Sequence, residues 1–475
     1  MADFKEFGNF DAIGLADLVR KNEVTPTELL DAAIERLNTV DPSINAVPIL
    51  HEDFARRQIA NGLPDGPFRG VPFLLKDLTI LEGTQTHFGS RAFKDYTADH
   101  SSTLAVRYLK AGLTIFGKTN SPEFGLSFTT EPVLHGPTRN PWNLNHSTGG
   151  SSGGAAAVVA ARVLPVAHAT DGGGSIRVPA SCCGGFGLKP TRARTPLGPD
   201  RLEGWAGMSY AHVISLSVRD SAAMLDATHG AEPGSPYAAP PPERPFLDEV
   251  SRAPGKLRIA FTDRHPDGSA IDPEVAAAVR GVATLLEKLG HSVEEGAPKT
   301  AGDAGAITRT IIASSTTFLL RQRAADLGRE IGLDDVEFVT FAIQSLAAQI
   351  SGADYVAATV AMHQIGRQFA QFFETADVFL SPTLCLPPLE LGRLDMTSRD
   401  IDAYMALIGR YVPGTALFNI SGQPSMSVPL AWSQGGLPLG MMFSARTGDE
   451  ATLFRLAAQL EKERPWKNKK PPISA

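Results

Sequence analysis

The stretch STGGSSGGAAAVVAARVLPVAHATDGGGSIRVPASCCGGFGLKPT, residues 147–191, contains two glycine-rich turns, and each turn carries serine. Between the turns, AAAVVAARV (155–163) predicts a helix of small, mostly buried side chains, and LPVAHAT (164–170) predicts a strand. We expect this helix and strand to bring the two turns face to face. The alternation of helix and strand favours an α/β fold.

The same alternation extends outward on both sides. VPFLLKD (71–77) is typical of a buried strand, and LAVRYLKAGLTIFG (104–117) predicts a helix that stops at Gly112 and leads into a strand. Farther along, residues 256–296 predict a strand, an amphipathic helix and another strand. These elements together predict an α/β protein with a mainly parallel or mixed sheet.

Two other segments bear on the organisation of the chain. In TPTELLDAAIERL, Thr25 is placed as a helix N-cap, Pro26 as the first helical residue and Glu28 as the partner in a capping box. The proline-rich segment at 231–245 fits a linker between domains and equally fits a surface crossing within one domain.

The composition is that of an ordinary globular protein and disfavours several functional classes. The 475 residues carry a net charge of −7 and are 43% hydrophobic, whereas a broad nucleic-acid surface needs clustered positive charge. Three cysteines, Cys182, Cys183 and Cys385, form neither a disulfide framework nor a CxxC metal site. With no apolar run of membrane-spanning length and no secretory leader pattern, we expect a cytoplasmic protein without nucleic-acid, membrane or metal partners.

The glycine-containing segments match the residue patterns of two known motifs, but not the structural context that either motif needs. Residues 112–119 spell the P-loop pattern GxxxxGK[ST], but the intervening LTIF is β-prone, so its N–H groups are expected in a sheet and not around a phosphate. Residues 149–153 spell the nucleophile elbow GxSxG. That motif needs a histidine base, and His168 lies in the middle of an expected strand, a position typical of a packed core residue.

A third interpretation joins both turns into one site. Three glycines precede Ser175 at an expected helix N-terminus, where free N–H groups and the helix dipole favour an anion, as an oxyanion hole requires. The other turn offers Ser151 as a proton relay. Lys76 ends the strand at 71–77, where burial would lower its pKa and leave a neutral amine that can act as a base. Asp77 would face away from this site, because successive strand residues point to opposite faces.

Several of these motifs resemble the amidase signature family. GGSSGG followed by TDGGGSIRVPASCCGGFGLKPT resembles the family's signature, VPFLLKDL resembles its lysine strand, and FNISGQPSMSVPL resembles its C-terminal strands. The resemblance covers most of the chain. It implies one domain over residues 1–475, with a large twisted mixed β-sheet covered by α-helices, a signature core at about 70–195, and a C-terminal part at 246–475 that shapes the substrate pocket.

The resemblance implies a Ser–cis-Ser–Lys triad. Ser175 would be the nucleophile, Ser151 the bridging serine after a cis peptide bond, and Lys76 the base, with Ser152 in support. Such a triad attacks an amide carbonyl and forms an acyl-enzyme that water then cleaves. It needs no metal and no organic cofactor.

Other residues would support this triad. The resemblance implies that the N–H groups of Gly172, Gly173, Gly174 and Ser175 belong to the oxyanion hole. It also implies that Asp171 and Arg177 brace the site. For the last two, a direct catalytic effect and a purely structural salt link or cap remain equal alternatives. Gly172 departs from the family pattern, which often has a larger side chain at this position. The lack of that side chain removes no N–H donor from the oxyanion hole and leaves room near the oxyanion.

The signature leaves the substrate open. Segments such as PTRNPWNL and FNISGQP look like those of hydrolases that act on nylon-type oligomers, so we expect a linear or cyclic amide as the small-molecule substrate, with aryl acylamidases and carbamate (urethane) hydrolases as alternatives. A less favoured alternative is the amidase subunit of a tRNA-dependent amidotransferase, which would need partner chains; we expect a monomer or homodimer instead.

Pocket candidates are the segment 121–130, with Gly125, Thr129 and Thr130, and the segment 310–323. Cys385 lies either near the pocket or in the core.

Overall fold

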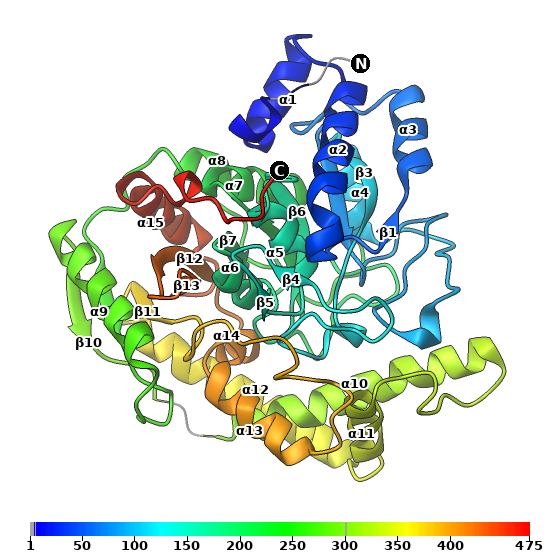
Figure 1. Cartoon of the computed structure of the whole chain (residues 1–475). Coiled ribbons are helices and arrows are strands. Elements are labelled where there is room, and N and C mark those ends of the chain that lie inside the picture. Colours follow the sequence, from blue (N-terminus) through cyan, green and yellow to red (C-terminus); the bar gives the residue numbers. More distant parts are fainter. Residues whose placement is uncertain (1–3, 5, 300–301) are drawn as a thin grey trace.

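The computed structural model describes residue 4, residues 6–299 and residues 302–475. An eight-stranded sheet runs through the middle of the molecule, with helices around it (Figure 1). The strands of the sheet follow in the order β10 (Ser292–Glu295), β9 (Arg258–Phe261), β11 (Val378–Pro382), β13 (Pro438–Ala445), β12 (Ser425–Trp432), β7 (Phe186–Lys189), β8 (Tyr210–Ser215) and β6 (Val166–Asp171).

This sheet is mixed, as the sequence predicted. β9 pairs in parallel with β10 and β11, whereas the pairs from β11 through β13, β12, β7 and β8 to β6 are antiparallel. Strands from before and after the proline-rich segment 231–245 belong to this one sheet. The segment therefore crosses between strands of the same sheet and is not a linker between separate sheets.

A smaller sheet carries the lysine strand. Its order is β1 (Ile49–Leu50), β3 (Thr114–Thr119) and β2 (Pro72–Lys76), with β2 and β3 parallel. All of β3 is buried, so the P-loop letters lie in a sheet ladder, as the β-prone residues predicted. The backbone N–H of Lys76 donates to His168 Nδ1 of β6 at 3.1 Å, which ties the end of β2 to the large sheet and confirms His168 as a core residue.

Helices surround these sheets, and α5 lies inside the molecule. Every residue of α5 is buried, because its alanines, glycines and valines let it fit closely between its neighbours. A further ribbon pairs β4 (Arg139–Asn140) with β5 (Asn143–Ser147). The helices are α1 (Ala12–Arg20), α2 (Pro26–Ile44), α3 (Glu52–Ala60), α4 (Thr103–Lys110), α5 (Gly153–Ala160), α6 (Arg177–Cys183), α7 (Val218–Thr228), α8 (Phe246–Glu249), α9 (Pro273–Lys288), α10 (Ala304–Leu327), α11 (Phe338–Ala347), α12 (Gly352–Phe372), α13 (Ile401–Tyr411), α14 (Thr415–Ser421) and α15 (Glu450–Glu463).

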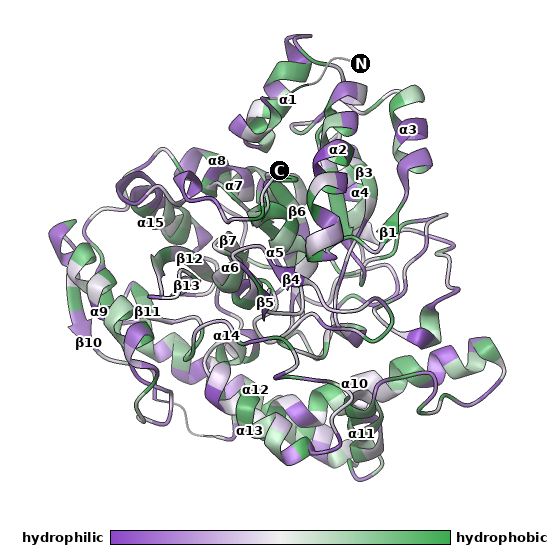
Figure 2. Cartoon of the chain, in the orientation of Figure 1, coloured by the Kyte–Doolittle hydropathy of each residue, from purple (hydrophilic) through white to green (hydrophobic). Residues whose placement is uncertain are grey.

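Local sequence signals set the ends of the helices. The capping box at Thr25 and Glu28 is present and starts α2, which continues beyond the expected segment to Ile44 and includes Pro42. The outer helices carry hydrophilic and hydrophobic residues together, as α9 and α12 show in Figure 2. Among the residues that the structure describes, no helix combines the length and apolarity needed to cross a membrane.

Candidate active site

Lys76 lies at the end of β2 and is fully buried. Its Nζ is 2.7 Å from Ser151 Oγ, 3.0 Å from Ser152 Oγ and 2.9 Å from Thr170 Oγ1. Burial lowers the pKa of Lys76 well below its ordinary value, and the charge of Asp171 opposes this only in part. The three hydroxyls therefore surround an amine whose neutral form is favoured by burial.

The turn that carries Ser151 is held tightly from one side. The peptide bond between Gly150 and Ser151 is cis. A Cβ at Gly150 would lie 2.4 Å from the backbone oxygen of Thr129, so the position admits only glycine. Thr130 Oγ1 accepts a hydrogen bond from the N–H of Gly153 at the start of α5. Thr130 Oγ1 also donates to the backbone oxygen of Gly149, so the buried Thr130 stabilises this turn, whereas the buried Thr129 hydroxyl donates to the backbone oxygen of Leu394.

Ser175 lies in the second turn, between β6 and α6. Asp171 Oδ1 accepts the N–H of Gly174 at 2.7 Å, and its Oδ2 accepts the N–H of Ile176 at 3.1 Å. The N–H of Gly174 is therefore already used, which corrects its expected place in the oxyanion hole. Among the described residues, the N–H groups of Gly172, Gly173 and Ser175 have no hydrogen-bond partner, so these three remain free to bind an anion.

Asp171 and Arg177 form a fully buried, bidentate ion pair. Burial alone would raise the pKa of Asp171, but the Arg177 guanidinium and the Asn419 amide hold it at about 2. Asn419 Nδ2 donates to both the backbone oxygen and the carboxylate of Asp171. The pair thus caps the loop that holds Ser175, and Asp171 also acts on Lys76 through its charge.

Sequence reasoning missed three residues that contact this site. Thr170 is a hydrogen-bond partner of Lys76, Thr415 donates to the backbone oxygen of Gly173, and Asn419 holds Asp171. Thr170 directly precedes Asp171 in the signature, and Asn419 lies in FNISGQP, so both stood in segments that the sequence had singled out. Nothing in the sequence around Thr415 indicated its contact.

A cavity of about 240 Å³ opens above these serines. Ser151, Thr170 and Ser175 line one side, and the rest of the wall combines apolar side chains with polar and charged ones, among them Asp200 and Arg201. Gly125 lines the cavity, but Thr129 and Thr130 do not: the Thr130 hydroxyl contacts the turn described above, and the Thr129 hydroxyl donates to the backbone oxygen of Leu394. From the segment 310–323, Ser315, Thr316 and Leu319 of α10 contribute. The apolar wall includes Leu78, Ile80, Phe88, Leu104, Phe124, Leu197, Trp205 and Leu319.

Cys385 does not line this cavity. It lies in a separate one of about 170 Å³, beside Phe379, Leu417 and Met442. Burial raises the pKa of the Cys385 thiol to about 12, so the group is an unreactive thiol at neutral pH.

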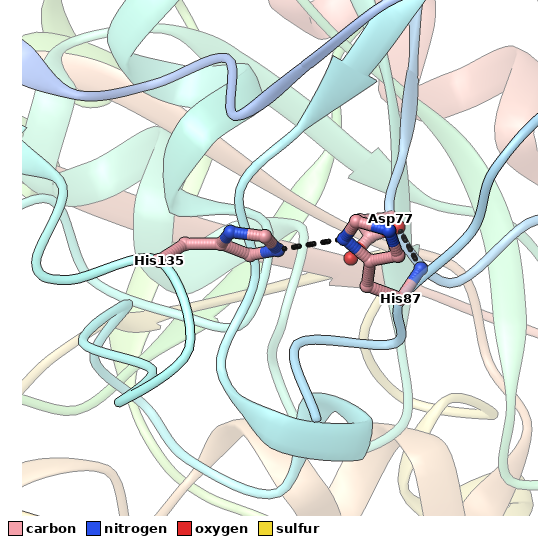
Figure 3. A group of neighbouring side chains, drawn as sticks. All are labelled: Asp77, His87 and His135. Carbon is pink, nitrogen blue, oxygen red and sulfur yellow. Dashed lines mark hydrogen bonds between the residues drawn. The ribbon is translucent and has the colours of Figure 1, made fainter. Parts of the chain in front are cut away.

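Asp77 faces away from Lys76, as the strand alternation predicted, and lies beside His87 and His135 (Figure 3). Its two oxygens accept the backbone N–H groups of His87 at 2.7 Å and Gly89 at 3.1 Å, and the two imidazoles hydrogen-bond to each other at 3.2 Å. The three side chains could offer ligand atoms to a metal within 4.8 Å of one another. Their existing hydrogen bonds, however, explain them as a support for the loop that follows β2.

Comparisons with known proteins show the family of this chain. The sequence profile of the family Amidase matches residues 28–454. The 6-aminohexanoate-cyclic-dimer hydrolase of Pseudomonas sp. (strain NK87) is 39% identical over 477 residues, which cover 98% of this chain and 96% of that protein. A solved structure of a 6-aminohexanoate cyclic dimer hydrolase has a TM-score of 0.93 at 38% identity and covers 98% of this chain and 99% of the other.

A bacterial aryl acylamidase of the amidase signature family is also similar. Its structure has a TM-score of 0.86 at 28% identity and covers 97% of both chains. Fold, buried lysine, serine turns and comparisons all lead to the same assignment. The chain therefore belongs to the amidase signature family, and it is an amide hydrolase that acts on C–N bonds other than peptide bonds.

Proposed function

We propose that this protein hydrolyses an uncharged carboxylic amide through an acyl-enzyme on Ser175. The observation that carries the proposal is the 2.7 Å contact between the buried amine of Lys76 and the hydroxyl of Ser151, at the edge of a cavity that Ser175 also lines. A neutral lysine can withdraw a proton from Ser151, and Ser151 can withdraw one from Ser175. The Ser175 oxygen then attacks the amide carbon.

Charge that develops on the carbonyl oxygen needs donors in fixed positions. The free N–H groups of Gly172, Gly173 and Ser175 supply them in this scheme. The proton taken by Lys76 returns through Ser151 to the leaving amine as the C–N bond breaks. Water then attacks the ester carbon at Ser175, and the same relay accepts the proton of the water. The C–O bond to Ser175 breaks as that proton returns to the Ser175 oxygen, which releases the carboxylic acid and regenerates the free enzyme.

For the substrate, we infer a hydrophobic or nylon-oligomer-like amide, linear or cyclic. The apolar wall of the cavity supports an uncharged chain, and the similar hydrolases are named for the cyclic dimer of 6-aminohexanoate. The aromatic rings of Phe88, Phe124 and Trp205 in that wall favour an aryl acylamide as the second candidate. A carbamate presents a comparable carbonyl and is a further candidate.

A hydrolysis panel tests this proposal. It compares an anilide, a primary aliphatic amide, a carbamate and the cyclic dimer of 6-aminohexanoate, with the wild type, Ser175→Ala and Ser345→Ala. Ser345 is an exposed serine on α11 and serves as the matched control. We expect cleavage of at least one amide by the wild type and the control, and none by Ser175→Ala.

Gel filtration of the active enzyme adds a second criterion. If the hydrolase works without other proteins, its activity elutes in a peak whose apparent mass is that of a monomer or a homodimer. Activity that requires an added partner protein, or a Ser175→Ala variant as active as the wild type, would contradict the proposal.

A further inference from the structure

Trp205 occupies the space that a side chain at position 172 would fill. A Cβ built on Gly172 would lie 2.4 Å from Cζ3 and 2.7 Å from Cε3 of the Trp205 ring. No heavy atom can approach a carbon so closely, so any residue other than glycine at 172 must displace the indole. The glycine that departs from the family pattern and the tryptophan therefore form one steric pair.

The loop around Trp205 fixes the ring in this place. Trp205, Ala206 and Gly207 all have positive φ, at 52°, 51° and 78°, a conformation that non-glycine residues adopt only when their surroundings impose it. The N–H of Met208 donates to the backbone oxygen of Trp205 at 3.1 Å. The ring also packs against the apolar cluster formed by α10, α12 and α14.

The same loop is connected to the Ser175 turn. Asn419 Nδ2 donates to the backbone oxygen of Met208 at 3.0 Å and to Asp171 Oδ1 at 2.8 Å. One buried amide thus sets the distance between the tryptophan loop and the turn that carries the free N–H groups. Trp205 in turn lines the cavity together with Gly172, Ser151 and Ser175.

We propose that Trp205 is a specificity-determining residue that limits the bulk of the substrate next to its carbonyl carbon, and that Gly172 is required because it admits the indole. The inference rests on the proposed function, since it assumes that the carbonyl oxygen binds at the N–H groups beside Gly172. With the ring in place, a substrate with an unbranched carbon beside the carbonyl fits. A quaternary carbon at that position meets the indole.

The test uses the 4-nitroanilides of acetic, isobutyric and pivalic acids, which differ only in branching beside the carbonyl. The pivaloyl group carries three more methyl groups than the acetyl group, and one such group alone changes kcat/KM by about tenfold or more in an apolar pocket, so we expect Trp205→Ala to raise the ratio of kcat/KM for the pivaloyl over the acetyl substrate at least about tenfold. Trp205→Phe, which keeps an aromatic ring on the apolar cluster, should give a smaller change. A ratio unchanged in Trp205→Ala would overturn the inference; because it is a ratio, partial unfolding of a variant cancels.

A double-mutant cycle tests the steric pair. Gly172→Ala should lower kcat/KM for the acetyl substrate about tenfold or more in the wild-type background, and much less in Trp205→Ala, where the new methyl group has room. Equal losses in both backgrounds would show that Gly172 acts independently of Trp205.

Binding to the Ser175→Ala variant separates this inference from the proposed function. We expect the dissociation constant of the pivaloyl anilide, relative to that of the acetyl anilide, to fall when Trp205→Ala is added to Ser175→Ala. If Ser175→Ala were fully active, the proposed mechanism would fail. If it were inactive and the relative dissociation constants did not change, the role of Trp205 alone would fail.

Discussion

Lys76 is the base in the proposed mechanism, and its amine is surrounded by hydroxyls and not by carboxylates. Ser151, Ser152 and Thr170 contact its amine, whereas Asp171 acts on it without a direct hydrogen bond. Hydroxyls stabilise an ammonium ion less well than a carboxylate does, so burial dominates and the pKa falls. Lys118, buried nearby beside Asp77, shows the contrast: burial lowers its pKa only to about 8, and the Asp77 charge works against that shift.

Activity should follow the protonation of Lys76. Because the neutral amine is the base in the proposed mechanism, kcat/KM should be at its maximum above the folded-state pKa of Lys76 and should fall as the pH drops through that pKa. Lys76→Arg, whose guanidinium stays protonated, should lose activity by about 10²–10⁴-fold at every pH. A pH–rate profile of each variant provides the measurement. An acidic limb that His168→Ala removes and Lys76→Arg leaves in place would contradict this assignment.

At the scale of elements, the short helix α14 links the C-terminal part of the chain to the Ser175 turn. Its Thr415 donates to the backbone oxygen of Gly173, and its Asn419 holds Asp171. Arg177, at the start of α6, donates to the backbone oxygen of Thr415 from the other side. The position of the free N–H groups therefore depends on how α14 packs against α6.

Removing the hydroxyl of Thr415 tests this link. Thr415→Val keeps the shape but leaves the partly buried oxygen of Gly173 without its donor, which should cost about 1 kcal/mol of unfolding free energy. We also expect kcat to fall about tenfold or more, because the donors beside Gly173 lose their alignment. Thr415→Ser, which retains the hydroxyl, is the matched control. Urea denaturation and steady-state kinetics measure both effects; a kcat equal to that of wild type would show that α14 does not position the turn.

At the scale of the whole molecule, a buried ion pair fastens α15 to the segment that follows β7. Arg194 donates to both oxygens of Glu450 at 3.0 Å, and the N–H of Thr191 donates to the same carboxylate. Burial alone would raise the pKa of Glu450, but Arg194 more than offsets this and lowers it. This contact stabilises the region that leads into the cavity wall at Leu197.

Breaking this pair should destabilise the fold. Arg194→Met leaves the Glu450 charge buried without its partner, and we expect a loss of about 3–5 kcal/mol in urea denaturation at pH 7. In the wild type, the stabilisation from Glu450 is present above its unfolded pKa of about 4.5 and is lost as the pH falls through the lower folded value. Arg329→Met breaks the exposed pair with Asp335 and should change stability by less than about 1 kcal/mol. Equal effects of the two substitutions would refute this assignment.

Sequence patterns predicted much of the fold and many residues of the candidate site. Apolar runs and glycine stops indicated β2, β3, α5, β6 and α9, because local periodicity and turn residues report burial directly. The glycine-rich motifs led to Ser151 and Ser175 as candidates, the apolar strand at 71–77 led to Lys76, and Lys76 does contact Ser151. Gly174 was misjudged as a free donor, since only the structure reveals that the carboxylate of Asp171 accepts its N–H.

The sequence by itself determined the fold class, because the fold class depends on residue types at short spacings, and it made Lys76, Ser151 and Ser175 candidates through local motifs and the resemblance to the family. The tertiary structure alone decided which distant groups meet: Thr415 at Gly173, Asn419 at Asp171, and Trp205 in the space left by Gly172. Those contacts join segments more than thirty residues apart. They follow from how helices and loops pack against the sheet, which no local pattern in the chain records.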